Sequence, residues 1–128
     1  MGLSSSKTLQ DLRYEFESII IINQGNFSFY GNIVKNAKKV LQLLTPTITL
    51  EKLCKIQNMY IPTMLSDFAK SKYTDTHLRK ASAIITVLSR EKCENEYNEL
   101  RDENKKYKEE NDRYKKEIQR LQEEVHIL

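Results

Sequence analysis

The chain has no tryptophan and only two cysteines, two histidines, two prolines and three glycines among its 128 residues. Cys54 and Cys93 show neither a CxxC spacing nor a metal-type spacing with His77 and His126, which argues against a disulfide framework and a zinc site. Local spacing places no nucleophile or carboxylate beside either histidine, and the glycines lie too far apart to form a phosphate-binding loop. We therefore predict two surface histidines, no metal, no cofactor and no catalytic residue, so the protein is not expected to be an enzyme.

The chain also has no long hydrophobic run. Its longest uninterrupted apolar stretch, Ile19 to Ile22, is far too short to cross a bilayer, and no apolar segment of signal-peptide length follows the start. The predicted location is the reducing cytoplasm. There Cys54 is expected as a core residue and Cys93 as a reduced, buried thiol.

Acidic residues are scarce in the first part of the chain. Residues 1–90 carry 12 Lys and Arg against 6 Asp and Glu, a balance of +6, whereas residues 91–128 carry 9 against 12, a balance of −3. An anionic partner should therefore meet residues 1–90 rather than the C-terminal part.

The strongest positive signal is a heptad repeat that runs from Tyr97 to Leu128 without a glycine or proline. With Tyr97 at position a, every a and d position holds an apolar, aromatic or asparagine residue. The a positions are Tyr97, Asn104, Asn111, Ile118 and Val125, and the d positions are Leu100, Tyr107, Tyr114, Leu121 and Leu128. This seam has the 3.5-residue spacing of helices that wrap around each other in a left-handed supercoil. Tyrosine at two d positions leaves a trimer open as an alternative to a dimer.

The charges that flank the seam indicate how two helices would run. In a parallel homodimer, each glutamate at position g faces the e position five residues further on in the other chain. The resulting ion pairs are Glu96 with Arg101, Glu103 with Lys108 and Glu110 with Lys115. An antiparallel homodimer would place like charges together, and the asparagines at a positions also favour parallel pairing. We therefore predict a parallel homodimer.

The residues before the seam show the periodicity of amphipathic helices. The first helix is predicted from a cap at Thr8 to a turn at residues 23–26, and the second from Phe27 to Leu44. A third begins at a cap at Thr49 and is broken by Pro62 near Tyr60 and Ile61, and Pro62 suits the first turn of a fourth helix with Met64, Leu65 and Phe68. The last is predicted from about His77, capped by Asp75 or Thr76, to Leu128. A short strand within residues 19–30 is the alternative there, because β-branched residues favour strands.

The apolar stripe of the last helix changes register partway along. Its first part consists of Leu78, Ala81, Ile84, Ile85 and Leu88, which do not share the heptad register and are expected to pack against the preceding helices. The predicted fold is all-α, with a flexible N-terminal arm (residues 1–8), a small basic helical head domain (9–92) and a long C-terminal helix whose stalk (93–128) forms a parallel two-stranded coiled coil. Cys93 falls on the back-extrapolated d position, where two copies would face each other.

The first seven residues fit the pattern for N-myristoylation. Removal of Met1 would free the amine of Gly2, with Ser6 at the hydroxyl position and Lys7 directly after it. This segment resembles the start of lipid-anchored Src-type kinases and of several viral matrix proteins, and the resemblance covers these seven residues. It implies acylation of Gly2; the alternative is an unmodified, disordered serine-rich start.

A parallel zipper behind a basic segment also suggests a basic-leucine-zipper DNA-binding protein, which we reject. In that family a continuous basic helix enters the major groove directly before the zipper. Here the corresponding stretch, Arg79 to Arg90, contains Ile84, Ile85, Val87 and Leu88. Burying each of these side chains in a core is favourable by roughly 1.5–3 kcal/mol, which contact with DNA would forfeit.

Two functions remain. The first is a homodimeric coiled-coil adapter, scaffold or matrix-like structural protein on the cytoplasmic face of a membrane, where myristoylation of Gly2 gains avidity from dimerisation. Lys35, Lys38 and Lys39, together with Lys7 and Arg13, would be attracted to an anionic membrane surface, and an unidentified protein would be the further partner. The alternative is a soluble dimer whose basic head binds nucleic acid non-specifically.

Overall fold

The computed structural model describes the backbone of residues 2–25, 27–68 and 70–127, and the side chains of residues 8–25, 31–68 and 70–126. The chain divides into two compact units, a head unit of Met1–Cys93 and a stalk unit of Glu94–Leu128. The fold is all-helical, and the described residues form no strand. The isoleucines at 19–22 therefore lie within a helix, and the alternative of a short strand there is wrong.

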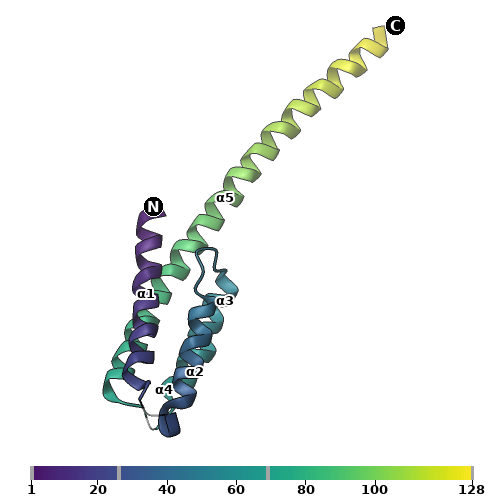
Figure 1. Cartoon of the computed structure of the whole chain (residues 1–128). Helices are drawn as coiled ribbons and strands as arrows, with labels where there is room; N and C mark the ends of the chain where they lie inside the picture. Colours follow the sequence, from purple (N-terminus) through teal and green to yellow (C-terminus); the bar gives the residue numbers. More distant parts are fainter. Residues whose placement is uncertain (1, 26, 69, 128) are drawn as a thin grey trace. The chain divides into compact units, whose positions relative to one another are not determined.

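The head unit is an up-and-down bundle of four helical segments (Figure 1). Helices α1 (Gly2–Asn23) and α2 (Phe27–Leu43) pack against each other as an antiparallel pair. The chain returns beside α2 through α3 (Leu50–Lys55), the π-helix η1 (Ile56–Tyr60) and α4 (Ile61–Leu65). Helix α5 (Lys72–Ile127) follows, and its residues up to Cys93 complete the bundle. The long C-terminal helix predicted from the sequence is thus confirmed.

Two side-chain contacts show the direction of α5 against α1 within the head unit. The amide of Asn23, the last residue of α1, donates to Thr74 Oγ1 at 3.0 Å. Glu15, two turns earlier in α1, contacts His77, which lies further along α5. Helix α5 therefore runs antiparallel to α1, and the beginning of α1 and the last head residues of α5 lie at the same end of the bundle.

The core lies between the four segments and consists of their inward-facing apolar side chains. They are Leu12, Phe16 and Ile19 from α1, Ile33, Ala37, Val40, Leu44 and Ile48 from α2 and the connection after it, Leu53, Ile56, Ile61 and Met64 from the third segment, and Leu78, Ala81, Ile85 and Leu88 from α5. Residues three and four apart share one side of a helix, which is why their spacing predicted the buried faces. The packing of residues 78–88 against the head is confirmed, with Ile84 partly buried. Val87, also expected to be buried, is instead 43% exposed.

The third segment does not break at Pro62 as the sequence predicts. Thr49 caps α3 as expected, since its hydroxyl oxygen accepts from the Lys52 N–H at 3.2 Å. The helix then widens into η1, where the Ile61 N–H donates to the Ile56 carbonyl five residues back. Pro62 falls in the first turn of α4, as predicted. Its missing N–H and its ring would disrupt a regular α-helical turn, and the wider π turn accommodates both without ending the helix.

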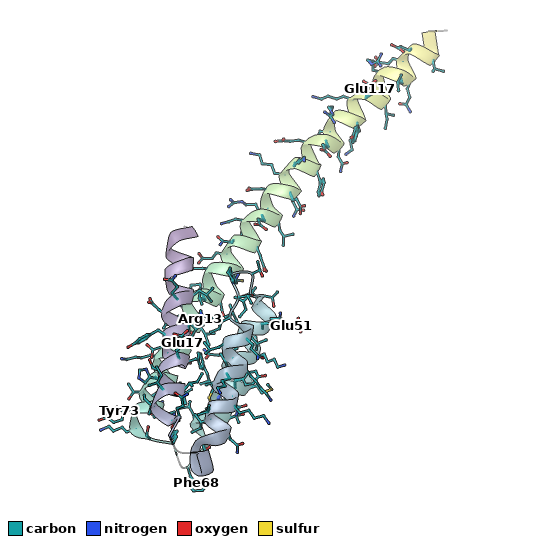
Figure 2. The ribbon with its side chains drawn as sticks, viewed as in Figure 1. Arg13, Glu17, Glu51, Phe68, Tyr73 and Glu117 are labelled. Carbon is teal, nitrogen blue, oxygen red and sulfur yellow. The ribbon has the colours of Figure 1, made fainter. Side chains whose placement is uncertain are left out.

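Two further predictions for this segment are wrong. Cys54 is not a core residue: it is exposed, and its Sγ accepts a hydrogen bond from Asn58 Nδ2 at 3.0 Å. It directly follows the buried Leu53, so the helix rotates it away from the core. Phe68 lies beyond α4, which ends at Leu65, and its side chain is fully exposed (Figure 2).

Helix α5 begins at Lys72, earlier than predicted. Its cap is Ser71, whose hydroxyl oxygen accepts from the Thr74 N–H at 3.1 Å. Asp75, a predicted cap, lies instead in the first turn, where Arg79 Nε donates to its carboxylate at 2.8 Å. This hydrogen bond lowers the pKa of the Asp75 carboxyl and raises the pKa of Arg79. Asp75 therefore stabilises the helix start through its charge, and Ser71 satisfies the free N–H group.

Helix α1 begins at Gly2, ahead of the cap predicted at Thr8. Met1 and the side chains of residues 2–7 lie outside the described part of the structure. The flexible arm predicted for residues 1–8 and the acylation motif within it therefore stay predictions. Leu128, the last residue of the predicted seam, also lies outside the described residues.

Candidate dimer seam and basic surface

The seam runs along one face of α5 in the stalk unit. The helix is unbroken to Ile127, so side chains spaced three and four residues apart follow one another along that face. Its large apolar and aromatic side chains are exposed, from 47% at Leu121 to 72% at Val125. They are Tyr97, Leu100, Tyr107, Tyr114, Ile118, Leu121 and Val125, and the exposed Asn104 and Asn111 lie between them. No described residue of the chain covers this face.

The charged side chains predicted to pair between chains lie beside the seam in solvent. Glu96, Arg101, Glu103, Lys108 and Lys115 are exposed, and Glu110 is partly exposed. Within the chain, Arg101 Nε lies 3.7 Å from the carboxylate of the adjacent Asp102. A long, exposed ion pair of this kind contributes little free energy, so it does not hold Arg101 away from a second chain.

One charge cluster in the stalk unit was not predicted. Arg120 lies between two glutamates, with Nη2 2.6 Å from Glu117 Oε1 and Nη1 2.5 Å from Glu124 Oε1. The hydrogen bond from Arg120 lowers the pKa of Glu117, and Glu117 raises the pKa of Arg120. The i,i+3 and i,i+4 spacings were the available sequence signal. Glu117 is the g-position acid that would face the uncharged Gln122 of a second chain, and it finds its partner within its own helix.

The three lysines predicted to meet an anionic surface lie on one side of α2. Lys35, Lys38 and Lys39 are all exposed, on the side opposite the buried Ile33 and Ala37. Helix α2 contains no acidic residue, so nothing on the helix itself neutralises them. The structure therefore brings together the lysines that the sequence proposed as one surface.

Arg13, predicted to act with these lysines, has a structural role instead. Its guanidinium donates to the Leu41 and Leu44 carbonyls at 3.3 and 2.9 Å, and it lies 3.8 Å from the Glu17 carboxylate (Figure 2). It thereby adds a hydrogen-bond donor at the C-terminal end of α2, where the Leu41 carbonyl also accepts from the Leu44 N–H at 3.2 Å. Because the contact depends on α1 and α2 packing together, local sequence did not reveal it.

His77 is not the surface histidine that local spacing predicts. Its Nδ1 lies 2.5 Å from Glu15 Oε2, and the two side chains are only 20% and 10% exposed. Nearby, the buried Asn23 donates to the Ile19 carbonyl at 2.7 Å and to the buried Thr74 hydroxyl at 3.0 Å. These contacts between α1 and α5 join residues 62 and 51 positions apart, so only the tertiary structure shows them.

The described residues offer little other chemistry. Cys54 and Cys93 are free thiols on the surface of the single chain, and His126 is exposed near the end of α5. Across the described ranges, no group of three or more His, Cys, Asp or Glu side chains is placed to hold a metal ion. Nor does any helix in this part of the chain combine the length and apolar character that crossing a membrane requires.

Comparison with known proteins gives no match. No protein family fits the chain, and no curated protein or solved structure is significantly similar to it. The function must therefore be inferred from the chain's own seam, basic surface and N-terminal motif.

Proposed function

We propose that this protein is a non-enzymatic, parallel homodimeric adapter or matrix-like scaffold, held on the cytoplasmic face of a membrane by myristoylation of Gly2. The observation that carries the proposal is the uncovered seam on α5, whose large side chains stand 47% to 72% exposed in the single chain. Covering such side chains is favourable by roughly 1.5–3 kcal/mol for each one that becomes fully buried. Another helix with the same spacing is the partner that the seam fits.

A second copy of the chain is the occupant that the charges favour. In parallel register, Glu96, Glu103 and Glu110 each meet a basic residue of the other chain, and no like charges meet at these positions. Each exposed pair contributes only ~0.2–1 kcal/mol, so the pairs select the direction more than they supply the affinity. The apolar layers from Ile118 onward would supply most of the affinity.

Dimerisation would supply the second membrane-binding contribution that a single myristoyl group needs for stable attachment. One myristoyl chain binds a membrane only marginally and reversibly. A dimer carries two, and insertion of the second becomes intramolecular, which raises the overall affinity by ~100- to 10,000-fold. In the head unit, α1 begins at the same end as the last head residues of α5, so pairing of stalks near Cys93 would bring the two acylated ends together.

Gly2→Ala is expected to release the protein from membranes in eukaryotic cells. Alanine cannot accept the myristoyl group, because the acyltransferase requires an N-terminal glycine. Intact mass should show loss of Met1 and gain of a C14 acyl chain in the wild type but no acyl chain in the variant. Membrane fractionation should then move the variant to the supernatant.

The matched control is Gly31→Ala in α2. A Cβ at Gly31 would meet no atom within 4 Å, so the substitution should leave both the fold and the membrane fraction unchanged. A wild-type protein that loses Met1 but carries no acyl chain would refute the anchor. So would a Gly2→Ala variant that stays with the membrane as the wild type does.

Cys93 offers a direct test of the parallel direction. In a parallel dimer, the two Cys93 thiols would face each other at a d position, within the range that a disulfide spans. In an antiparallel dimer they would lie at opposite ends of a rod about 50 Å long, given a rise of 1.5 Å per residue. Mild oxidation of a Cys54→Ser variant should therefore give covalent dimers in high yield.

Two further results complete this test. A Cys93→Ser variant, which keeps only Cys54, should give few covalent dimers under the same oxidation. Sedimentation of both variants without oxidant should show the dimer mass. If the Cys54→Ser protein sediments as a dimer and yet forms no disulfide, the parallel assignment is wrong.

A further inference from the structure

The lysines of α2 belong to a wider basic face of the head unit. Lys35, Lys38 and Lys39 lie within five residues of one another and point away from the core. The chain then turns back, and α3 presents Lys52 and Lys55, both exposed, in the segment that packs beside α2. Lys38 and Lys39 lie near the end of α2, and Lys52 and Lys55 follow the start of α3, so the two groups lie toward the same end of the bundle. These five lysines are called the basic face below.

The five lysines of this face have few acidic residues beside them. Helix α2 has none, and from α3 to α4 the chain has only Glu51 (Figure 2). Other parts of the head unit differ. Helix α1 carries Asp11, Glu15 and Glu17, and on α5 the basic Arg79 is bound to Asp75. The basic face is therefore the most uniformly positive surface of the described head.

The basic face also lies toward the end of the bundle at which α1 begins. Arg13 of α1 donates to carbonyls at the end of α2, so the residues before Arg13 extend from that end. The helical rise of 1.5 Å per residue places Gly2 about 16 Å further along α1. An acyl chain on Gly2 would therefore lie toward the same end of the bundle as the basic face.

We infer that the basic face is a docking surface for anionic phospholipid headgroups, and that the head unit lies against the bilayer along α2 and α3. This inference adds a second membrane-binding element to the proposed function. It rests on that function only in assuming that the protein meets a membrane, and it does not require acylation of Gly2. Lysine ammonium groups suit diffuse headgroup charge, because each acts as a mobile point charge rather than as a shaped fork. The five lysines lie on the solvent-facing sides of α2 and α3, an arrangement that suits contact with a flat membrane surface.

Nucleic acid is a less suitable ligand for this face. Binding of single strands without sequence preference uses a basic groove together with aromatic side chains on which bases stack. Among the residues of α2 whose side chains the structure describes, the exposed ones around the lysines are Asn32 and Gln42. Tyr60 of η1 has its ring centroid 5.9 Å from Lys55 Nζ and is only partly exposed.

The test uses the full chain with a free Gly2 amine, so that acylation plays no part. Binding is measured by co-sedimentation with phosphatidylcholine vesicles that contain about one third phosphatidylserine, the anionic lipid of cytoplasmic leaflets. The test variant neutralises α2 through Lys35→Gln, Lys38→Gln and Lys39→Gln. The matched control neutralises three exposed basic residues of α5 in the head, through Lys72→Gln, Lys80→Gln and Arg90→Gln. Circular dichroism should show the same helix content in all three proteins.

We expect the α2 variant to bind up to about 100-fold more weakly than the wild type, since each lysine near an anionic surface contributes ~1 kcal/mol and 1.4 kcal/mol is a tenfold change. The control should lose less than about threefold, and pure phosphatidylcholine vesicles should bind none of the proteins. Equal losses in the two variants, or no binding of the wild type, would overturn the inference. So would a single-stranded RNA that binds more tightly than the vesicles and is released by the α2 substitutions. Because Gly2 is unmodified here, these outcomes are independent of the Gly2→Ala experiment.

Discussion

Leu121→Asp is expected to convert the proposed homodimer into a monomer. Leu121 occupies a d position in the most apolar part of the seam, between Ile118 and Val125. The substitution removes roughly 1.5–3 kcal/mol of apolar burial from each chain and places two carboxylates together on the dimer axis. The apolar loss alone, ~3 kcal/mol or more per dimer, weakens association on the order of 100-fold. Sedimentation of the full chain should show the monomer mass at concentrations at which the wild type is dimeric.

The matched control is Gln119→Asp, which adds the same charge two residues earlier. Gln119 falls at the b position and is exposed on the side of the stalk helix away from the seam. This variant should remain a dimer and keep its helix content. If the wild type and Leu121→Asp have the same mass, the seam is not the surface through which the chains associate.

Phe16→Ala is expected to destabilise the head unit by ~3–5 kcal/mol. Phe16 is 0% exposed and is the largest fully buried side chain in the described part of the chain, so alanine would leave a cavity that the packed helices can only partly close. A loss of this size is a large part of the ~5–15 kcal/mol that stabilises a typical domain. Amide hydrogen exchange in α1 and α2 should report it, because these amides belong to the head unit alone.

Tyr14→Ala serves as the matched aromatic control in the same helix. Tyr14 is 62% exposed, and truncation of an exposed side chain of this kind usually changes stability by about 0.5 kcal/mol or less. Exchange rates in α1 should therefore rise strongly for Phe16→Ala and little for Tyr14→Ala. Equal increases would contradict the placement of Phe16 in the core.

Most of the fold could be predicted because it follows from local periodicity. The spacing of Ile33, Ala37 and Val40 marks the buried side of α2, and the stripe at residues 78–88 marks the buried side of α5. Helix ends were harder to predict. Asp75 and Ser71 are both residue types that cap helices. Ser71 is the cap in the structure because its hydroxyl oxygen accepts from the Thr74 N–H, one of the free N–H groups of the first turn.

Contacts between helices distant in sequence could not be predicted. His77 has no carboxylate within its own helical turns that local spacing would pair with it, yet α1 brings Glu15 to its ring. Arg13 was likewise predicted to face an anionic membrane surface, and only the antiparallel packing of α1 and α2 places it at the last carbonyls of α2. In both cases the partners come together because of how the helices of the bundle are ordered and directed. The spacing of apolar residues within each helix does not reveal that arrangement.

For the seam and the lysines of α2, the sequence predicted which residues belong together, and the structure shows which of them are exposed on one side of a helix. The heptads defined the seam residues by position, and the structure shows an unbroken helix on which the seam residues from Tyr97 to Val125 are exposed. The structure in turn separates Lys35, Lys38 and Lys39, which share one solvent-facing side, from Arg13, which does not join them. The dimer itself stays a prediction, to be decided by the sedimentation and crosslinking experiments.

The π-helix has a consequence for changes in chain length. The buried residues of the third segment, Leu53, Ile56, Ile61 and Met64, are separated by steps of three, five and three residues. In a regular α-helix a five-residue step would turn Ile61 about 140° away from Ile56, so the wider turn of η1 is what keeps both side chains inward. If one residue between them were deleted, Ile56 and Ile61 would be four residues apart, and an ordinary α-helix places residues at that spacing on the same side. Because a regular α-helical turn does not accommodate Pro62, such a deletion would keep the inner face of the bundle in register only if Pro62 were replaced as well.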